Sequence, residues 1–154
     1  MAINIQKTLE LDFSGLSRSQ KEEAKEEIKE YIVDTILDYV SKEKSPVSGG
    51  KWKGLSPEYK KLKSKISGST KANMELEGDM LDELAADFVG NKLKVGFGKD
   101  ASELTKLKAE NHNKFTQRAK KTKLPERNFI PKKEQTFKRD ILRDINSIID
   151  EYRE

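Results

Sequence analysis

A long amphipathic helix is the feature that most constrains how this sequence folds. Between residues 18 and 42, apolar side chains recur at helical spacing, at Ala24, Ile28, Tyr31/Ile32, Thr35/Ile36 and Tyr39/Val40. Lysines and glutamates fill the positions between them in the first turns, so the predicted helix has one apolar and one charged face. Ser17 and Gln20 match a capping box, in which the two side chains bind free backbone N–H groups. The apolar stripe must be buried, either in the core of the same domain or in a helical bundle or coiled coil.

Two other segments alternate in the manner of half-buried strands. Residues 3–13 carry apolar side chains at odd positions, interrupted at Lys7, which predicts one or two short strands with a single buried face. Leu93, Val95 and Phe97 alternate after a predicted turn at Gly90-Asn91. This second pattern predicts a strand that pairs with residues 84–89 in a small antiparallel sheet.

Three further helices are predicted, separated by loops. They cover residues 57–66, with Ser56 as N-cap, residues 101–112, capped by Asp100 with Glu103, and residues 132–152, marked by Phe137, Ile141, Ile145, Ile148 and Tyr152. Residues 113–128 lack periodicity, and with Pro125 and Pro131 this predicts an irregular arm at about residues 113–131. The 154 residues are therefore interpreted as one α+β domain. In it a small antiparallel sheet packs with two long helices, N-terminal and C-terminal, and with short helices.

Charge is abundant but unevenly distributed along the chain. Charged residues make up 38% of the sequence while the net charge is only +4, which argues against a disordered chain and against a domain dominated by nucleic-acid binding. Residues 45–74 carry seven basic residues and one acidic residue, residues 75–90 carry six acidic residues and no basic one, and residues 105–133 carry ten basic and two acidic residues. Such segregation is typical of a subunit whose differently charged faces meet neighbours. The hydrophobic share of 34% predicts a thin core that partner subunits help to complete.

The inventory of catalytic and metal-binding side chains is small. His112 is the single histidine and cysteine is absent, so disulfides, thiol nucleophiles and a two-histidine metal site are excluded within one chain. Val95-Gly96-Phe97-Gly98 lacks the third glycine of a dinucleotide-binding loop and is interpreted as a turn. The acidic residues of 75–90 lack the order of a calcium loop, which favours a solvated or partner-facing patch. We therefore expect no enzyme, cofactor or metal, and we see neither a signal-peptide pattern nor a membrane span.

A basic segment with interleaved aromatic residues runs from Lys114 to Lys133. Such a segment binds nucleic acid through phosphate contacts and stacking, or it docks on an acidic protein face such as that of residues 75–90. Copies of one chain with complementary charge can also associate head to tail into a ring. Composition and spacing leave both self-assembly and nucleic-acid binding open.

Five short motifs follow one another between residues 50 and 131. They are Gly50-Lys51-Trp52-Lys53-Gly54-Leu55-Ser56-Pro57-Glu58-Tyr59-Lys60-Lys61-Leu62-Lys63, Leu76-Glu77-Gly78-Asp79-Met80-Leu81, Leu93-Lys94-Val95-Gly96, Ala109-Glu110-Asn111-His112-Asn113 and Leu124-Pro125-Glu126-Arg127-Asn128-Phe129-Ile130-Pro131. Their order, with a terminal helix after them, resembles that of the phage virion-morphogenesis proteins, the tail-completion and head–tail joining family of tailed phages. The glycine that this family usually places shortly after its His-Asn element is absent, since Lys114-Phe115 follow here.

The resemblance implies a small α+β protein without enzymatic activity. It implies a ring, commonly of six copies, at the head–tail junction or at the end of the tail tube. The implied partners are connector or stopper and tail-tube proteins, with transient contact to DNA passing through the lumen and no membrane. The implied location is the virion, after assembly in the host cytoplasm. A small nucleic-acid-binding or regulatory protein that uses the basic arm is the alternative function.

Five candidate interface or structural residues come from the first, second and fourth motifs. Trp52 and Tyr59 are expected to clamp the predicted short helix onto the core, with core packing alone as the alternative, and Leu55 belongs to the same motif. Gly78 is the glycine of the second motif. His112 is expected to act through packing or an interface contact.

The remaining candidates lie in the basic segment. Phe129 is expected to anchor the arm. Arg127, two residues away in an extended segment, faces the opposite side and is expected to contact a neighbour or a backbone carbonyl. Arg118, Lys120 and Lys121 are expected on an intersubunit surface or on a surface that faces DNA.

Overall fold

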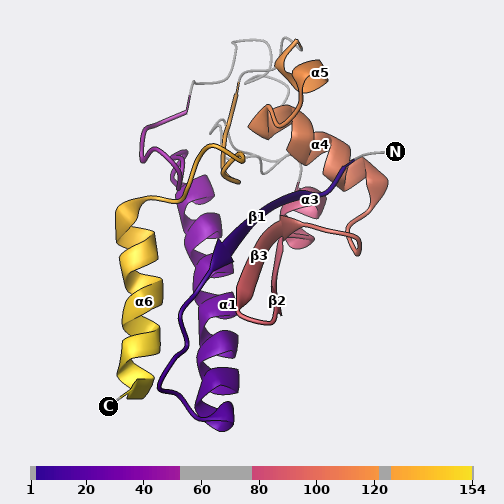
Figure 1. Cartoon of the computed structure of the whole chain (residues 1–154). Coiled ribbons are helices and arrows are strands. Elements are labelled where there is room, and N and C mark those ends of the chain that lie inside the picture. The colour runs from indigo at the N-terminus through magenta and orange to yellow at the C-terminus, as the bar shows by residue number, and fades with distance from the viewer. Residues whose placement is uncertain (1–2, 53–77, 122–125, 154) are drawn as a thin grey trace.

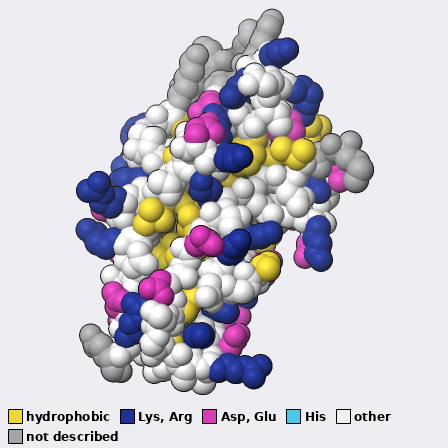
Figure 2. All heavy atoms as spheres, in the orientation of Figure 1, with side chains coloured by type: hydrophobic (Ala, Val, Ile, Leu, Met, Phe, Trp, Pro, Cys, Tyr) yellow, Lys and Arg dark blue, Asp and Glu magenta, His cyan; other side chains and the backbone are white. Residues whose placement is uncertain are grey.

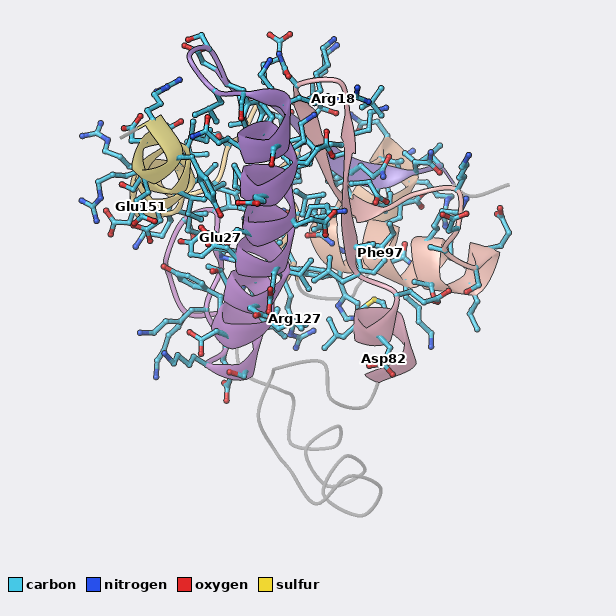
Figure 3. All side chains as sticks on the ribbon, turned by 90° about the horizontal axis from the view of Figure 1, so that it is seen from below. Arg18, Glu27, Asp82, Phe97, Arg127 and Glu151 are labelled. Carbon is cyan, nitrogen blue, oxygen red and sulfur yellow. The ribbon has the colours of Figure 1, made fainter. Side chains whose placement is uncertain are left out.

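The chain folds into a three-stranded antiparallel sheet that packs with helices, which confirms the predicted α+β class. The computed structural model describes residues 3–52, 78–121 and 126–153. The elements are, in chain order, β1 (Ile5–Glu10), α1 (Arg18–Ser41), α3 (Gly78–Asp82), β2 (Ala85–Val89), β3 (Lys92–Phe97), α4 (Glu103–Asn113), α5 (Gln117–Lys120) and α6 (Arg139–Arg153). The strand order is β1-β3-β2. Figures 1 and 3 show α1 between α6 and the sheet, and Figure 1 shows α4 and α5 at the end of the molecule where β1 begins.

The predicted N-terminal helix is confirmed as α1. Its capping box is present, because the Ser17 hydroxyl accepts from the Gln20 N–H and the Gln20 side chain accepts from the Ser17 N–H. Its stripe contacts α6 and β2 of the same chain, so the helix is part of the domain core. The buried residues of this stripe are Ala24, Ile28, Ile32, Ile36 and Val40.

The C-terminal helix is shorter than predicted. α6 begins at Arg139, whereas the sequence pattern predicted a start at residue 132. Phe137 is buried as the pattern required, but from non-helical backbone that precedes the helix. The stripe of α6 follows a strict four-residue interval, so half-buried Ile148 is not part of it. Its buried members are Ile141, Ile145 and Ile149.

Lys7, which interrupts the alternation of β1, contacts the segment that precedes α6 and that was predicted to be helical. Its register places it opposite Val95, on the core-facing side of the sheet. Its ammonium group donates to the backbone carbonyls of Lys132 at 3.2 Å and Lys133 at 3.3 Å, and also to that of Gln135. Residues 132–135 form a turn at this point, closed by the Gln135 N–H, which donates to the Lys132 carbonyl at 2.9 Å, and Lys7 binds the carbonyls of that turn.

The predicted turn at Gly90-Asn91 and the strand pairing after it are confirmed. β2 and β3 pair antiparallel, with Phe88 opposite Leu93. Gly96 of β3 has a φ of +136°, and a Cβ added there would collide with the carbonyl oxygen of Ile5 on β1. Glycine is therefore required for β1 and β3 to approach each other at this position.

The predicted helix of residues 101–112 is α4, but its N-cap differs from the prediction. Ser102, not Asp100, caps this helix, and its hydroxyl accepts from the Thr105 N–H at 3.2 Å. The Glu83 carboxylate accepts from the Ser102 N–H at 3.0 Å and binds the hydroxyls of Ser102 and Thr105. The hydrogen bonds from Thr105 and Ser102 hold the pKa of Glu83 below its ordinary value. One acid of the 75–90 block thus stabilises α4 within the chain, where the sequence suggested a solvated or partner-facing patch.

The ends of α1 and α6 are joined by side chains. The Gln20 amide donates to the Tyr152 carbonyl at 2.9 Å. The Arg153 guanidinium donates to the carbonyls of Asp12 at 2.7 Å and Ser14 at 2.9 Å, in the loop that leads into α1. These contacts hold the last turn of α6 against the start of α1 and the loop that precedes it.

Candidate functional site

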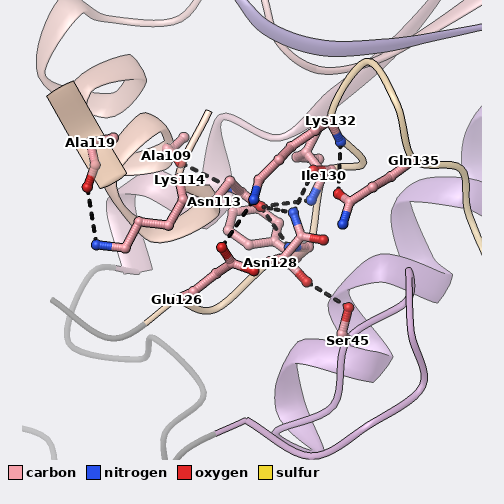
Figure 4. A network of polar contacts seen from close by, with 11 residues as sticks. Ser45, Ala109, Asn113, Lys114, Ala119, Glu126, Asn128, Ile130, Lys132 and Gln135 are labelled. Carbon is pink, nitrogen blue, oxygen red and sulfur yellow. Dashed lines mark hydrogen bonds and ion pairs between the residues drawn. The ribbon is translucent and has the colours of Figure 1, made fainter. Parts of the chain in front are cut away.

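Residues of two sequence motifs meet at the C-terminal end of α4. Asn113 is the last residue of that helix and is fully buried. Its side-chain oxygen accepts from the backbone N–H of Phe129 at 2.6 Å, from that of Ile130 at 2.8 Å and from the Asn128 amide at 3.3 Å. One side chain therefore satisfies two backbone N–H groups of the fifth motif and fixes this segment to α4, as Figure 4 shows.

The network continues into the loop after α1. The Asn128 side chain donates to the Ile130 carbonyl at 2.8 Å, and the Ser45 hydroxyl donates to the Asn128 carbonyl at 2.7 Å. The Arg127 N–H donates to the His112 carbonyl at 2.7 Å. We call this buried group the Asn113 cluster; it consists of Ser45, Asn113, Asn128 and the backbone of residues 127–130.

Phe129 and Arg127, both expected in the arm, are buried within the subunit. Phe129 is fully buried, and its ring meets that of Phe97 edge to face at 6.0 Å. Phe97 directly follows Gly96, so the strand motif also reaches this group. Arg127 is only 5% exposed and leaves little surface for a neighbour, although the alternation argument placed it opposite Phe129. Residues 127–131 of the fifth motif are thus packed in the core.

The first part of the predicted arm is folded rather than irregular. Lys114 has a φ of +54°, the left-handed conformation that favours glycine, in a stretch where the resembling family usually carries one. Its ammonium group donates to the Ala119 carbonyl at 3.1 Å. Thr116 then caps α5 by accepting from the Ala119 N–H at 3.1 Å. The prediction of an irregular arm over residues 113–131 is wrong at α5, where a short capped helix forms.

The predicted basic surface residues divide into two kinds. Arg118 forms an ion pair with Glu110, a carboxylate that is buried on α4. Lys120 and Lys121 are exposed and form no ion pair with a described residue. Figure 2 shows several Lys and Arg side chains at the end of the molecule that carries α5. Lys120 and Lys121 are therefore available to an external partner, whereas Arg118, also exposed, is engaged by Glu110 within the chain.

Of the four candidates in the first two motifs, Trp52 and Gly78 belong to the described residues. Trp52 is half-buried against the core, and its backbone N–H donates to the Glu43 carbonyl at 2.9 Å. Its indole Nε1 is buried and has no partner among the described residues. Leu55 and Tyr59, and with them the predicted helix of residues 57–66, lie outside the described residues. Gly78 is the first residue of α3.

The hydrogen bonds of the Asn113 cluster hold the backbone of residues 127–130 in place against α4. The Asn113 cluster contains amides, a hydroxyl and backbone groups, and none of these is an acid–base pair of the kind that activates a nucleophile. His112 is buried, 6% exposed. In residues 3–52, 78–121 and 126–153 no group of three or more acidic or histidine side chains is arranged to hold a metal ion. No helix in the described part of the chain has the length and apolarity needed to cross a bilayer.

Sequence reasoning selected Arg127, His112 and Phe129 but missed Asn113 and Asn128 as the residues that organise the site. The signal for Asn113 was its place at the end of a predicted helix, directly before an aperiodic segment whose backbone needs partners. The corresponding signal for Lys7 was the break that it makes in the alternation of β1.

No protein-family model, curated protein or solved structure matches this chain. The resemblance to virion-morphogenesis proteins therefore rests on the five motifs and on their order in the sequence.

Proposed function

We propose that the chain is a non-enzymatic structural subunit of a phage virion. In this proposal it assembles into a ring, commonly of six copies, at the head–tail junction or the end of the tail tube. It acts there in tail completion, tail termination or head–tail joining. The observation that carries the proposal is the Asn113 cluster. It brings the His-Asn motif and the Arg-Asn-Phe motif together, and Phe129 links both to the strand that contains Val95-Gly96.

Contact between these motifs supports the resemblance because it gives their residues one common task. Asn113 binds the backbone of Phe129, and Phe129 packs on Phe97 directly after the strand motif, so three of the five motifs contribute to one packed region. A scaffold held by positioning residues also suits a protein that acts by fitting neighbours.

The distribution of charge supports head-to-tail assembly. Lys120 and Lys121 are exposed at the α5 end. Exposed acids lie on the two long helices, and Figure 3 shows Glu27 on α1 and Glu151 on α6, away from α4. Opposite charges at separate places on one subunit favour heterologous contacts, and such contacts form a ring when the rotation closes.

The experiment is removal of this chain from the phage that encodes it. We expect full heads and complete tails to accumulate unjoined, and infectivity to return when the chain is supplied in trans. Normal numbers of intact virions without the chain would contradict the proposal.

Nucleic-acid binding is the second candidate, and the exposed Lys120 and Lys121 favour it. A chain that stays monomeric, both alone and with connector and tail-tube proteins, yet binds DNA with a steep salt dependence would establish this alternative.

A further inference from the structure

A hollow beside β1 gathers basic side chains from three separate parts of the chain. It has a volume of about 450 Å³ and is lined by Gln6, Lys7 and Thr8 of β1, by Phe115 and Lys120, and by Lys132, Lys133 and Glu134. Three consecutive residues of a strand alternate between its two faces, so a hollow that touches all three lies along the edge of the strand. This edge is the one away from β3, the only described strand with which β1 pairs.

Positive charge dominates the lining of this hollow. Four lysines and one glutamate line it, and two of the lysines are already engaged. Lys7 is held by the backbone carbonyls of residues 132, 133 and 135, and Lys132 pairs with Glu126 at 3.0 Å. Lys120 and Lys133 are exposed and form no ion pair with a described residue. Carbonyl dipoles leave the charge of Lys7 in place, so the field of the hollow is positive and two ammonium groups remain available to a ligand.

The hollow also offers neutral donors and an aromatic ring. Thr8 carries a hydroxyl and Gln6 an amide at the strand edge, and Phe115 is half-buried in the wall. Lysine ammonium groups attract phosphates as point charges, and aromatic rings in nucleic-acid channels contact bases or sugars. The volume lies in the range of pockets that hold a small molecule, which is more than a single carboxylate needs.

The acidic face of a second copy is the competing occupant, although part of it is already engaged. Glu22 and Glu26 of α1 already pair with Lys25 and Lys29 on the same helix. Glu83 is engaged in capping α4. Glu23, Glu27 and Glu30 of α1 are exposed and form no ion pair with a described residue, so they compete for the hollow. DNA is favoured because its phosphates present a continuous row of negative charge to lysines gathered in one place.

We propose that the hollow bounded by Lys7, Lys120, Lys132 and Lys133 binds the phosphodiester backbone of DNA. Lys120 and Lys133 contact phosphates directly, Lys7 supplies a fixed positive charge, and Phe115 contacts the sugar or base beside them. This site gives the nucleic-acid contact named above as the second candidate function a defined location, and it does not require ring assembly, because all its residues come from one subunit.

The test is a fluorescence-anisotropy titration of the purified full-length chain with a short DNA duplex over a range of salt concentrations. The site variant is Lys120→Gln/Lys133→Gln. The matched control is Lys51→Gln/Lys99→Gln, which removes the same charge from two exposed lysines outside the hollow. Thermal unfolding of each variant checks that the fold is retained, and inorganic phosphate added to the wild type distinguishes a site for DNA from a site for the free anion.

We expect the site variant to bind DNA about tenfold more weakly at low salt and the control to bind like wild type. The slope of log affinity against log salt should fall by about 1.8, because each lost phosphate contact removes about 0.9. Phosphate at millimolar concentration should compete only weakly with the duplex.

Three results of the DNA titration would overturn the site. They are absence of DNA binding by the wild type at low salt, equal weakening by the control, and full competition by free phosphate. A site variant that loses only self-association would assign the hollow to a second copy and would overturn it as well. Failure of ring formation would leave the DNA result intact, so this test and that of the proposed function are separate.

Discussion

The side-chain oxygen of Asn113 lies 2.6 Å from the backbone nitrogen of Phe129, 16 residues further along the chain. The bond joins the end of α4 to the segment that leads toward α6. Because the same oxygen also accepts from Ile130, one amide replaces the regular backbone pairing that this buried segment lacks.

Asn113→Ala is expected to lower the free energy of unfolding by about 3 kcal/mol. The substitution leaves two backbone N–H groups without an acceptor, and each such buried group costs about 1–3 kcal/mol. Urea unfolding measures the change. Asn146→Ala on the exposed face of α6 is the matched control and should stay within about 0.5 kcal/mol of wild type. Equal effects of the two variants would show that the Asn113 cluster does not stabilise the fold.

Gly96→Ala is expected to destabilise the chain by about 3 kcal/mol or more. The backbone at Gly96 has a φ of +136°, and the new Cβ would meet the carbonyl oxygen of Ile5. Gly90→Asn is the comparison, because Gly90 has a φ of +63° and its added Cβ meets no atom within 4 Å. Asparagine tolerates that left-handed conformation. Thermal melts should therefore separate the two variants clearly, and similar melting temperatures would contradict the close approach of β1 and β3.

Tyr31 should ionise later than an ordinary tyrosine. Its hydroxyl donates to the Asp144 carboxylate at 2.7 Å, across the contact of α1 with α6. Burial, followed by this hydrogen bond, raises the pKa of Tyr31 to about 12. The unfolded value is about 10, so the associated stability is complete below about pH 10 and is lost as the pH rises toward 12.

Ultraviolet titration of tyrosinate tests this shift. Subtracting the curve of Tyr31→Phe from that of wild type should leave one ionisation near pH 12. Asp144→Asn should move it to lower pH, whereas Asp140→Asn, on the same helix and paired with Arg143, should not. A difference curve centred near pH 10 would refute the contact.

Glu83 should make the chain sensitive to acid. Hydrogen bonds from Thr105 and Ser102 lower the pKa of Glu83, so its contribution to stability is present above the unfolded value of about 4.3. That contribution disappears as the pH falls through the lower pKa of the folded state. Glu83→Gln should therefore reduce stability near neutral pH and flatten the acid side of the stability profile. Asp82→Asn removes a charge from the exposed neighbour and should keep the wild-type steepness; identical profiles for Glu83→Gln and wild type would sink the prediction.

Local patterns were sufficient for the elements whose boundaries depend on near neighbours. The start of α1 is set by Ser17 and Gln20, three residues apart, and their spacing was enough to predict the capping box. The pairing of β2 with β3 likewise follows from alternation on both sides of Gly90-Asn91.

The sequence was less informative wherever a distant group decides the structure. The late start of α6 involves Lys7, more than 120 residues before the carbonyls that it binds. The cap of α4 includes Glu83, 19 residues before Ser102. Asn113 was missed for the same reason, because its partners at Phe129 and Ile130 are 16 and 17 residues away.

Ring assembly is the central claim, and the mass of the particle that the chain forms tests it most directly. Native mass spectrometry should be applied to the purified full-length chain, alone and mixed with the connector and tail-tube proteins of its phage. The account predicts one closed oligomer of defined copy number, six by the family resemblance, in at least the mixed sample. A monomer under both conditions would contradict it.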